Sequence, residues 1–524
     1  MTSDSKAAIA PIFLLCAIPL ALLAWRFDFV CDDAFISFRY SNHFADGLGL
    51  RFNRGVDPPV EGYTNLLWVL WCSIPERFNL DTGVFARVSL VACSLTLLLA
   101  LLRVLALRVG LREPALLGFG LVYASLPPVG LWTTSGLETM AFATALFVAF
   151  ERLAFDPHRP RVAQAALAIA AACLLRSDGF VWSGMLCIAL FGGGYLGQRR
   201  ELRRSALLLA GAVVLVAGTH IAWRLGYHGD WVPNTARAKV GFGAIAFERG
   251  SKYVLSWLAH FPVIPLAFGI GLARLVRVRD PLTVASLLFC TAGFAYVVAV
   301  GGDFLPMGRF LLPVVPFAVV ALATAFEGCG TARVSLAIAT AVASVASILP
   351  AWERTLVPAS VLDRTHYNWN FNERLSEVEL WRGEVRRAAV WSDLGRALAL
   401  HSEEGDSLIA ASVGAIGYHS GLFLFDQYGL VSREVALLPM EEGTRRSAGH
   451  DKYVDLAYFE KDRPTFMHAR LIEVDGNGEP LKRPPGNRRE PRYDQELIPL
   501  SVEDGFPPNT ALQVGRMKLG AEQD

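Results

Sequence analysis

Long runs without a single charge fill the first two-thirds of this 524-residue chain, and they constrain its fold more than any other feature. Residues 7–25 contain no charge, enough for a helix of about 20 residues to cross a hydrocarbon core roughly 30 Å thick. This run is too long for the apolar part of a signal peptide and no clean cleavage site follows it, so we expect a retained span. Further apolar runs lie near 84–107, 114–131, 137–150, 162–175, 180–197, 205–223, 253–273, 282–300, 310–326 and 333–350. The sequence therefore predicts an α-helical polytopic membrane protein with about eleven transmembrane helices.

Arginines between the runs predict how the helices are oriented. Basic residues follow each even-numbered run, for example Arg108 and Arg112 after the second and Arg199 and Arg200 after the sixth. Short cytoplasmic loops are enriched in Lys and Arg, so we expect an inner-membrane protein with a cytoplasmic N-terminus. An odd number of spans then places the C-terminal region outside the cytoplasm. The net charge of +1 gives no reason to expect nucleic acid as a partner.

The composition changes near residue 351, where charges become frequent and the long apolar runs stop. Residues 373–402 read as one or two amphipathic helices, 407–411 and 422–425 as short strands, and the Pro- and Arg-rich 479–492 as a loop. No cysteine lies after residue 350, so an exported domain there must hold together without disulfides. We expect a transmembrane domain at 1–350, an external catalytic loop at 28–82 within it, and a small extracytoplasmic α/β domain at 351–524.

Two adjacent carboxylates, Asp32 and Asp33, follow the first run by a few residues, in the segment CDDAFISFRYSNHFADGLG. Asp32 could be the N-cap of a short helix that runs to Ala45 or Asp46 and is closed by Gly47. That role explains one carboxylate of the pair but not both. We therefore expect at least one to be catalytic, as a general base on an incoming hydroxyl or by stabilising an oxocarbenium-like transition state.

The segment EGYTN at 61–65 opens an apolar, aromatic stretch from Leu66 to Trp71, which suits a helix lying on the membrane surface. Two interpretations of its polar side chains are open. They could cap this interfacial helix, or Glu61, Tyr63 and Asn65 could contact sugar hydroxyls.

A further polar segment, RSDG, lies between two predicted spans. Arg176 and Asp178 could form an ion pair that closes a tight turn. Alternatively, Arg176 could bind a phosphate, because a guanidinium matches the geometry of phosphate oxygens. The second interpretation makes Arg176 and Asp178 candidates for the lining of a substrate site.

Two later segments on the predicted external side also mix polar and charged residues. WVPNTARAK sets Arg237 and Lys239 beside Asn234, which suits a lipid phosphate or diphosphate but also a solvated interfacial loop. In GGDF, Asp303 could cap the next helix or line the same cavity as Asp33, and Arg309 follows it.

Nothing in the sequence predicts a metal ion or another cofactor. The 8 cysteines show no metal-ligand spacing, and neither do His43, His419 and His450. The GAIGY segment at 414–418 has the wrong spacing for a dinucleotide-binding loop.

The segment from Cys31 to Asn53, together with EGYTN, resembles the membrane glycosyltransferases of the GT-C superfamily. Within that superfamily it is most similar to the terminal β-(1→2)-arabinofuranosyltransferases of mycobacterial cell walls. Weaker matches follow in family order, in GDWVPNTARAK, GGDFLPMGRFLLP, DQYGLVSREVA and RRSAGHDKYV. The resemblance spans nearly the whole chain, although the C-terminal domain is short beside those of the mycobacterial enzymes.

This resemblance implies a sugar donor linked to polyprenyl phosphate, which is arabinofuranose on decaprenyl phosphate in the mycobacterial case. It also implies a polysaccharide or glycolipid acceptor and an external active site whose catalytic aspartate is Asp33 or Asp32. A single base would invert the anomeric carbon, whereas a carboxylate nucleophile would retain its configuration, and the sequence leaves both courses open.

Two functions of other classes compete with this one. A transporter for lipid-linked sugars would use intramembrane carboxylates and often has two repeated halves, but no repeat is visible here. A non-catalytic protein of envelope assembly would leave the aspartate pair unexplained.

Overall fold

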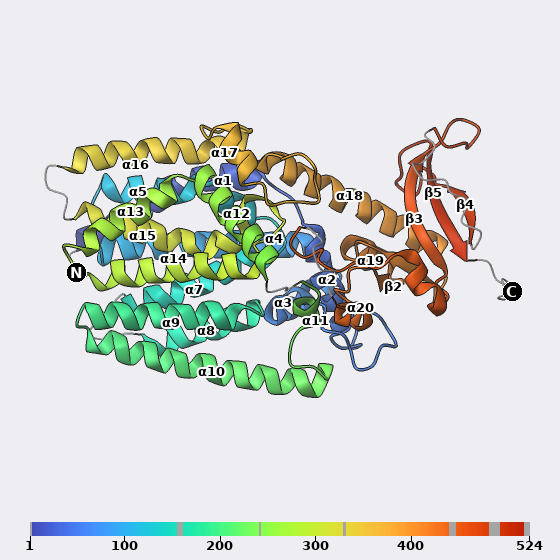
Figure 1. The fold of residues 1–524 in the computed structure, drawn as a ribbon, viewed down its shortest axis with the longest axis horizontal. Helices are drawn as coiled ribbons and strands as arrows, with labels where there is room; N and C mark the ends of the chain where they lie inside the picture. Colours follow the sequence, from blue (N-terminus) through green and yellow to red (C-terminus); the bar gives the residue numbers. More distant parts are fainter. Residues whose placement is uncertain are drawn as a thin grey trace.

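A computed structural model describes residues 3–154, 161–239, 243–327, 332–439, 447–481 and 493–517. Long helices form a bundle that holds the N-terminus, and a five-stranded sheet near the C-terminus lies at the opposite end of the molecule (Figure 1). Short helices lie between the bundle and the sheet. This arrangement confirms the predicted class, a polytopic helical membrane protein with a small C-terminal α/β part.

Seven helical segments in the described residues are long and apolar enough to cross a membrane. An eighth span results if α12 and α13, which are bent by 92° at a short break, count as one. The seven are α1 (Ser3–Arg26), α4 (Thr82–Leu107), α9 (Gly179–Leu196), α10 (Arg200–His228), α14 (Pro281–Val300), η1 with α15 (Pro306–Val314 and Val315–Phe326), and α16 with η3 (Arg333–Ile348 and Leu349–Trp352).

All the predicted apolar runs fold as helices, but several are short or broken. The run at 114–131 splits into α5 (Ala115–Ala124) and α6 (Pro127–Trp132), because Pro127 cannot continue the preceding helix. Pro262 likewise separates α12 from α13. The remaining helices of this part are α7 (Thr139–Ala154), α8 (Val162–Leu175), α12 (Ala244–His260) and α13 (Val263–Leu275). Length and composition thus support fewer single spans than the predicted eleven.

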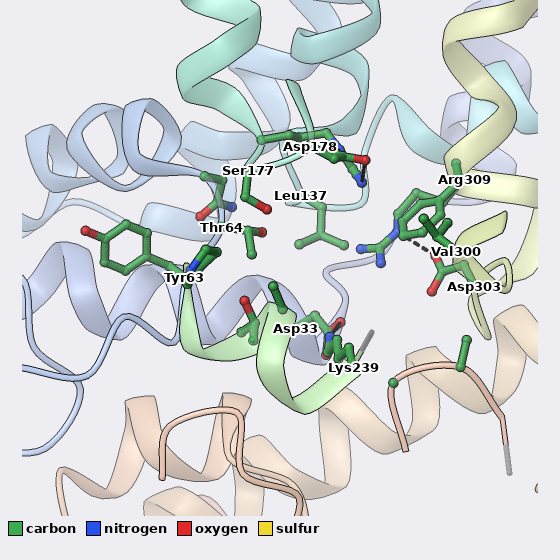
Figure 2. A pocket seen from close by; sticks show the side chains of 18 of the residues that line it. Asp33, Tyr63, Thr64, Leu137, Ser177, Asp178, Lys239, Val300, Asp303 and Arg309 are labelled. Carbon is green, nitrogen blue, oxygen red and sulfur yellow. Dashed lines mark hydrogen bonds and ion pairs between the residues drawn. The ribbon is translucent and has the colours of Figure 1, made fainter. Parts of the chain in front are cut away.

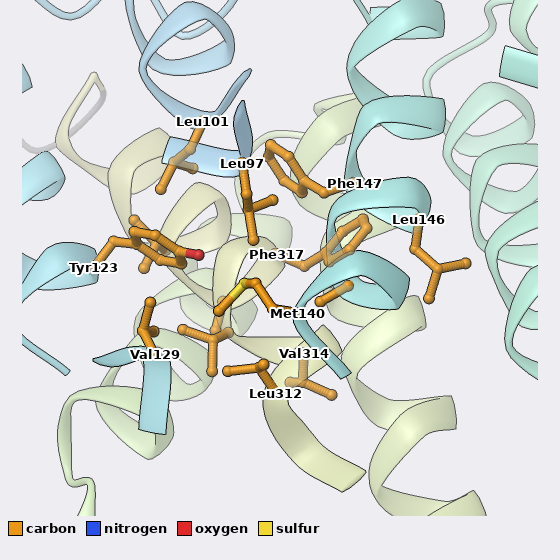
Figure 3. Packing of buried hydrophobic residues seen from close by; sticks show 14 of the residues in the cluster. Leu97, Leu101, Tyr123, Val129, Met140, Leu146, Phe147, Leu312, Val314 and Phe317 are labelled. Carbon is orange, nitrogen blue, oxygen red and sulfur yellow. The ribbon is translucent and has the colours of Figure 1, made fainter. Parts of the chain in front are cut away.

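The segment that contains η1 and α15 forms the centre of the bundle, since 89% of the residues in its most apolar stretch are buried. Its Phe317 ring packs against the rings of Phe147 and Phe289, with centroids 5.2 and 4.2 Å apart. Side chains of α4, α5 and α7 surround it (Figure 3). On α10 and α16 only 28% of the residues in the most apolar stretch are buried, so these helices offer apolar side chains to lipid.

The C-terminal sheet has the strand order β2-β1-β3-β5-β4, in which β2, β1 and β3 are parallel and β5 and β4 antiparallel to their neighbours. The predicted strands are confirmed as β1 (Ser407–Ala410) and β2 (Phe423–Asp426), and the predicted amphipathic segment as a single helix, α18 (Glu377–His401), which begins with a Ser376–Glu379 capping box. The other elements are α17 (Ala359–Arg364), α19 (Gly414–Ser420), α20 (Arg433–Leu437), η4 (Leu456–Asp462), β3 (Phe466–Glu473), β4 (Tyr493–Pro499) and β5 (Thr510–Met517). Most of the predicted loop at 479–492 and the two arginines of RRSAGHDKYV lie outside the described residues.

Three short helices join the bundle to the sheet region: α2 (Asp32–Ala45), α3 (Leu66–Arg77) and α11 (Asn234–Lys239). The predicted helix after the first span is confirmed in its bounds, with Gly47 at φ 78° just beyond its end. The predicted cap is wrong, because the N-cap is Cys31 and Asp32 is the first helical residue.

Candidate active site

A cavity of about 400 Å³ lies where the ends of the bundle helices meet α2, α11 and the C-terminal region (Figure 2). We call it the main cavity. Apolar side chains such as Ile36, Leu137, Val181 and Phe310 form part of its wall. Its polar lining consists of Asp33, Ser37, Tyr63, Thr64, Asn65, Glu138, Arg176, Ser177, Asp178, Thr235, Lys239, Tyr296, Asp303 and Arg309. A wall of this mixed kind suits a ligand with both a lipid and a polar part.

A second cavity of about 240 Å³ adjoins it on the side of α18 and the C-terminal sheet. Asp33, Lys239 and Phe304 line both cavities, so the two meet there. Its remaining wall is rich in aromatic and amide side chains. These include Asn368, Asn370, Phe371, Trp391, Tyr428 and His450, together with the charged residues Asp32, Glu384 and Arg387.

Asp33 is the carboxylate at this junction. It lies in the first turn of α2 with 19% of its side chain exposed. Its nearest cation is Lys239, whose Nζ lies 3.9 Å from Oδ2 (Figure 2). Among the described residues no group donates a hydrogen bond to the Asp33 carboxylate. The side chain is therefore available to a ligand in either cavity.

Asp32 has a different environment, although it is the neighbouring residue. Its Oδ1 accepts the backbone N–H of Ala415 at 2.8 Å, and the residue is only 7% exposed. Burial raises the pKa of Asp32 to about 7, against the opposing effect of the Ala415 hydrogen bond. Asp32 borders the second cavity and is absent from the lining of the main one. Its position therefore favours a structural role over the catalytic one that the sequence also allowed.

This raised pKa predicts how stability depends on pH. In the unfolded chain the Asp32 carboxyl loses its proton near pH 4, whereas in the folded protein it keeps it until about pH 7. Stability from this group is thus present below pH 4 and is lost as pH rises to 7. We expect the apparent melting temperature of Asp32→Asn to fall by a few degrees less than that of the wild type between pH 5 and pH 8. An equal fall in both proteins, measured by thermal unfolding in one detergent, would contradict this.

Two polar side chains of the EGYTN segment, Glu61 and Tyr63, bind residues of α10. Glu61 is 4% exposed and accepts from Nε and Nη2 of Arg224 at 2.5 and 3.2 Å. Tyr63 lines the main cavity, but its hydroxyl lies 3.1 Å from Nε2 of His228. The prediction that Glu61 contacts a sugar is not supported, because Glu61 lies outside both cavity linings and is fully engaged.

Asn65 reaches the main cavity and connects two elements there. Its Nδ2 donates to Oε2 of Glu138 at 2.8 Å and to the hydroxyl of Ser37 at 3.0 Å. Glu138 was not among the predicted site residues, although it lies in TTSGLET after the third apolar run. Glu138 could have been predicted as a site residue, because it is a carboxylate in a loop on the same predicted side of the membrane as Asp33.

Two arginines of the main cavity are held by carboxylates. Arg176 donates to Asp178 at 2.8 and 3.1 Å and lies 3.5 Å from Glu138. Arg309 Nε donates to Asp303 at 2.6 Å (Figure 2). The turn-closing ion pair is therefore present, and Arg176 still lines the cavity. The structure also places Asp303 in the cavity of Asp33, which is one of the two positions that the sequence left open.

The predicted phosphate loop at 231–239 divides into two parts. Nδ2 of Asn234 donates to the carbonyls of Gly429 and Leu430 at 2.7 and 3.0 Å, which fixes α11 to the C-terminal region. Arg237 is paired with Asp230 at 2.7 Å. Neither residue lines a cavity, so their proposed substrate contacts are not supported, whereas Lys239 lines both.

No cluster of three or more His, Cys, Asp or Glu side chains suited to a metal ion occurs in the described parts of the chain. The absence of a metal or another cofactor remains a prediction.

Comparison with known proteins agrees with this architecture. A family model described as a domain of unknown function matches residues 378–498. The terminal β-(1→2)-arabinofuranosyltransferase of Mycobacterium tuberculosis is 28% identical over 273 residues, which are 48% of this chain and 42% of the relative. The match thus spans less than half the length of that curated protein. It confirms the resemblance predicted from the motifs.

Solved structures show the same fold over nearly the entire chain. The apo crystal structure of ArnT from Cupriavidus metallidurans matches with a TM-score of 0.58 and 12% identity over 98% of both chains. The structure of that protein bound to undecaprenyl phosphate matches with a TM-score of 0.55 over 97% of both chains. The chain therefore has the fold of the GT-C membrane glycosyltransferases.

Proposed function

We propose that this protein transfers a sugar from a polyprenyl-phosphate donor to a cell-envelope glycan, on the outer face of the cytoplasmic membrane. The observation that carries the proposal is Asp33, a carboxylate without a hydrogen-bond donor among the described residues, where two cavities meet. The M. tuberculosis relative suggests arabinofuranose or a related sugar, and the undecaprenyl phosphate of the ArnT complex suggests the donor lipid.

In this proposal the main cavity holds the donor. The lipid lies along the apolar wall, and its phosphate meets the cations at the junction. Lys239 is the best placed, because its nearest carboxylate is 3.9 Å away, whereas Arg176 and Arg309 are bound to carboxylates at 2.8 and 2.6 Å. The unused N–H groups of these two arginines can add further hydrogen bonds.

Transfer then needs one bond exchange. An acceptor hydroxyl attacks the anomeric carbon, the bond from that carbon to the phosphate oxygen breaks, and polyprenyl phosphate leaves with the electron pair. Asp33 takes the proton of the hydroxyl. Phosphate is a good leaving group, so the main demands on the site are positioning and stabilisation of charge.

The second cavity suits the acceptor. The charged groups that line it are Asp32, Asp33 and Glu384 against Lys239 and Arg387, so acidic and basic groups nearly balance and an uncharged glycan fits better than a polyanion. Aromatic faces and amides, the usual partners of sugar rings and hydroxyls, make up much of the remaining wall.

Trp391 provides a direct test of this acceptor site. Trp391→Ala should raise the KM for the acceptor by roughly three- to tenfold, since one aromatic contact contributes about 0.5–1.5 kcal/mol. The KM for the donor should not change, because Trp391 lines the second cavity alone. Steady-state kinetics with each substrate varied separately would check this. A change in the KM for the donor alone would instead place the donor in the second cavity and the acceptor in the main cavity.

A transporter of lipid-linked sugars remains the alternative from another class. The charged residues that line the main cavity, such as Asp33, Lys239, Asp303 and Arg309, gather at one end of the bundle, beside α2 and α11 (Figure 2). A gated path would need such residues at the midplane. This distribution favours an enzyme.

The deciding experiment uses the purified full-length protein with radiolabelled polyprenyl-phosphate sugars and a crude envelope acceptor. Transfer of label into the acceptor supports the proposal. Movement of labelled lipid across a reconstituted bilayer without transfer would support the transporter instead. A topology reporter fused after Ala351 tests the orientation, and a cytoplasmic signal would overturn the external site.

A further inference from the structure

Asp32 and the C-terminal region are in direct contact. Oδ1 of Asp32 accepts the N–H of Ala415, which lies in the first turn of α19 and 383 residues away in sequence. The approach is so close that a Cβ on Gly414 would lie 2.2 Å from the Asp32 carbonyl oxygen and 2.7 Å from its Oδ2. Any side chain at position 414 must therefore push α19 and α2 apart.

A second contact lies two helical turns further along α2. The Arg39 guanidinium, which is 3% exposed, donates to the carbonyls of Gly417 at 2.7 Å and Leu422 at 2.6 Å. It also donates to the carbonyl of Phe52 at 2.8 Å. Asp32 thus holds the first turn of α19, and Arg39 holds the carbonyl of Gly417 within the helix and that of Leu422 just beyond its end.

Helix α19 is held from its other side by α18. A Cβ on Gly395 of α18 would lie 2.8 Å from Cβ of His419, so these helices also pack at close range. With α2 on one side and α18 on the other, α19 has little freedom to move. Because successive residues of a helix point about 100° apart, fixing Asp32 on α19 also fixes the direction in which Asp33 points.

We propose that the C-terminal segment 378–498, matched by the domain of unknown function, positions the reacting carboxylate Asp33, and that Asp32 is its main positioning residue. The inference rests on the proposed function for the reaction itself. It assigns to α18 and α19, which lie in this segment, a share in fixing the rotation of α2, beside the packing of α2 against α3. The first aspartate of the pair then has no chemical step of its own.

Four variants test the proposal: Asp32→Ala, Asp32→Asn, Gly414→Ala and, as a matched control, Gly476→Ala. Asn keeps an oxygen that can accept the Ala415 N–H, whereas Ala does not. Gly414 lines neither cavity, so its substitution removes no group that could touch a substrate. Gly476 lies in the same matched segment with open space around its Cα and an ordinary φ.

We expect Asp32→Ala and Gly414→Ala each to lower kcat by about tenfold or more with the donor KM within about twofold, as misplacement of a reacting group predicts. Asp32→Asn should recover most of the kcat that Asp32→Ala loses, and Gly476→Ala should match the wild type. The double variant should be no slower than the slower single one, because both changes break one contact. An Asp32→Asn protein as slow as Asp32→Ala would overturn the inference, and so would full activity in Asp32→Ala and Gly414→Ala.

Hydrogen exchange separates this inference from the proposed function. Amides of α2 should exchange faster in Asp32→Ala and Gly414→Ala than in the wild type and Gly476→Ala. If the wild type transferred no sugar from any polyprenyl-phosphate donor, the proposed function would be wrong. Hydrogen exchange of the α2 amides would still show whether the contact with α19 holds α2 in place. Unchanged exchange of α2 in both variants would overturn the positioning role.

Discussion

Replacing Asp33 with Asn should lower kcat for sugar transfer by about 100-fold or more, the usual loss on removal of a general base. The amide has the same shape but cannot take the proton of the acceptor hydroxyl. Asp33 accepts no hydrogen bond from the described residues, and its nearest cation lies 3.9 Å away, so the substitution should leave the fold intact. Transfer from radiolabelled donor in a single turnover measures the step directly.

The matched control is Asp46→Asn. Asp46 follows the last residue of α2, is exposed and lines neither cavity, so kcat should match the wild type. Donor binding by Asp33→Asn, measured by competition with unlabelled polyprenyl phosphate, should stay within about threefold of the wild type. A loss of less than tenfold in kcat (about 1.4 kcal/mol of barrier) would remove Asp33 from the catalytic role.

The helical class of the fold was predictable because each apolar run carries its signal locally. A lipid-exposed backbone must satisfy its own hydrogen bonds, so a long uncharged run has few alternatives to a helix. Interruptions were harder to predict. Pro262 lies inside a run that reads as one span, and it marks a 92° bend whose geometry depends on tertiary packing.

The candidate site was predictable only in part. Asp33, Asp178, Lys239, Asp303 and Arg309 all line the main cavity, which follows from their shared place at one end of the predicted helices. The sequence could not show which of them are available to a substrate, because that depends on what each side chain already binds within the fold. Lys239 and Arg237 stand two residues apart, yet Arg237 is held by Asp230 and Lys239 faces both cavities.

The polar residues that bind other parts of the chain could not be told from site residues in the sequence, for one reason. Glu61 pairs with Arg224, 163 residues away, and Asn234 bonds to carbonyls almost 200 residues away. No local pattern encodes such partners. A buried polar group must find one somewhere in the fold, so a polar motif beside a membrane span can serve packing as readily as chemistry.

Lys239 should be the main phosphate contact, and Lys239→Gln should lower kcat/KM for the donor by roughly 10- to 100-fold. A hydrogen bond to a charged group contributes about 1.5–3 kcal/mol, which corresponds to that range. Lys239→Arg keeps the charge and should recover much of the activity. Lys252→Gln is the matched control, because Lys252 pairs with Glu248 at 2.9 Å and lines neither cavity.

Lys239 could also act on Asp33 alone, since the two side chains form an ion pair at 3.9 Å. Inhibition by free polyprenyl phosphate separates these roles, because that product carries the phosphate but no reacting sugar. If Lys239 binds the phosphate, the inhibition constant should rise in Lys239→Gln by about as much as kcat/KM for the donor falls. An unchanged inhibition constant with a reduced kcat would assign Lys239 to Asp33, leaving Arg176 and Arg309 to bind the phosphate.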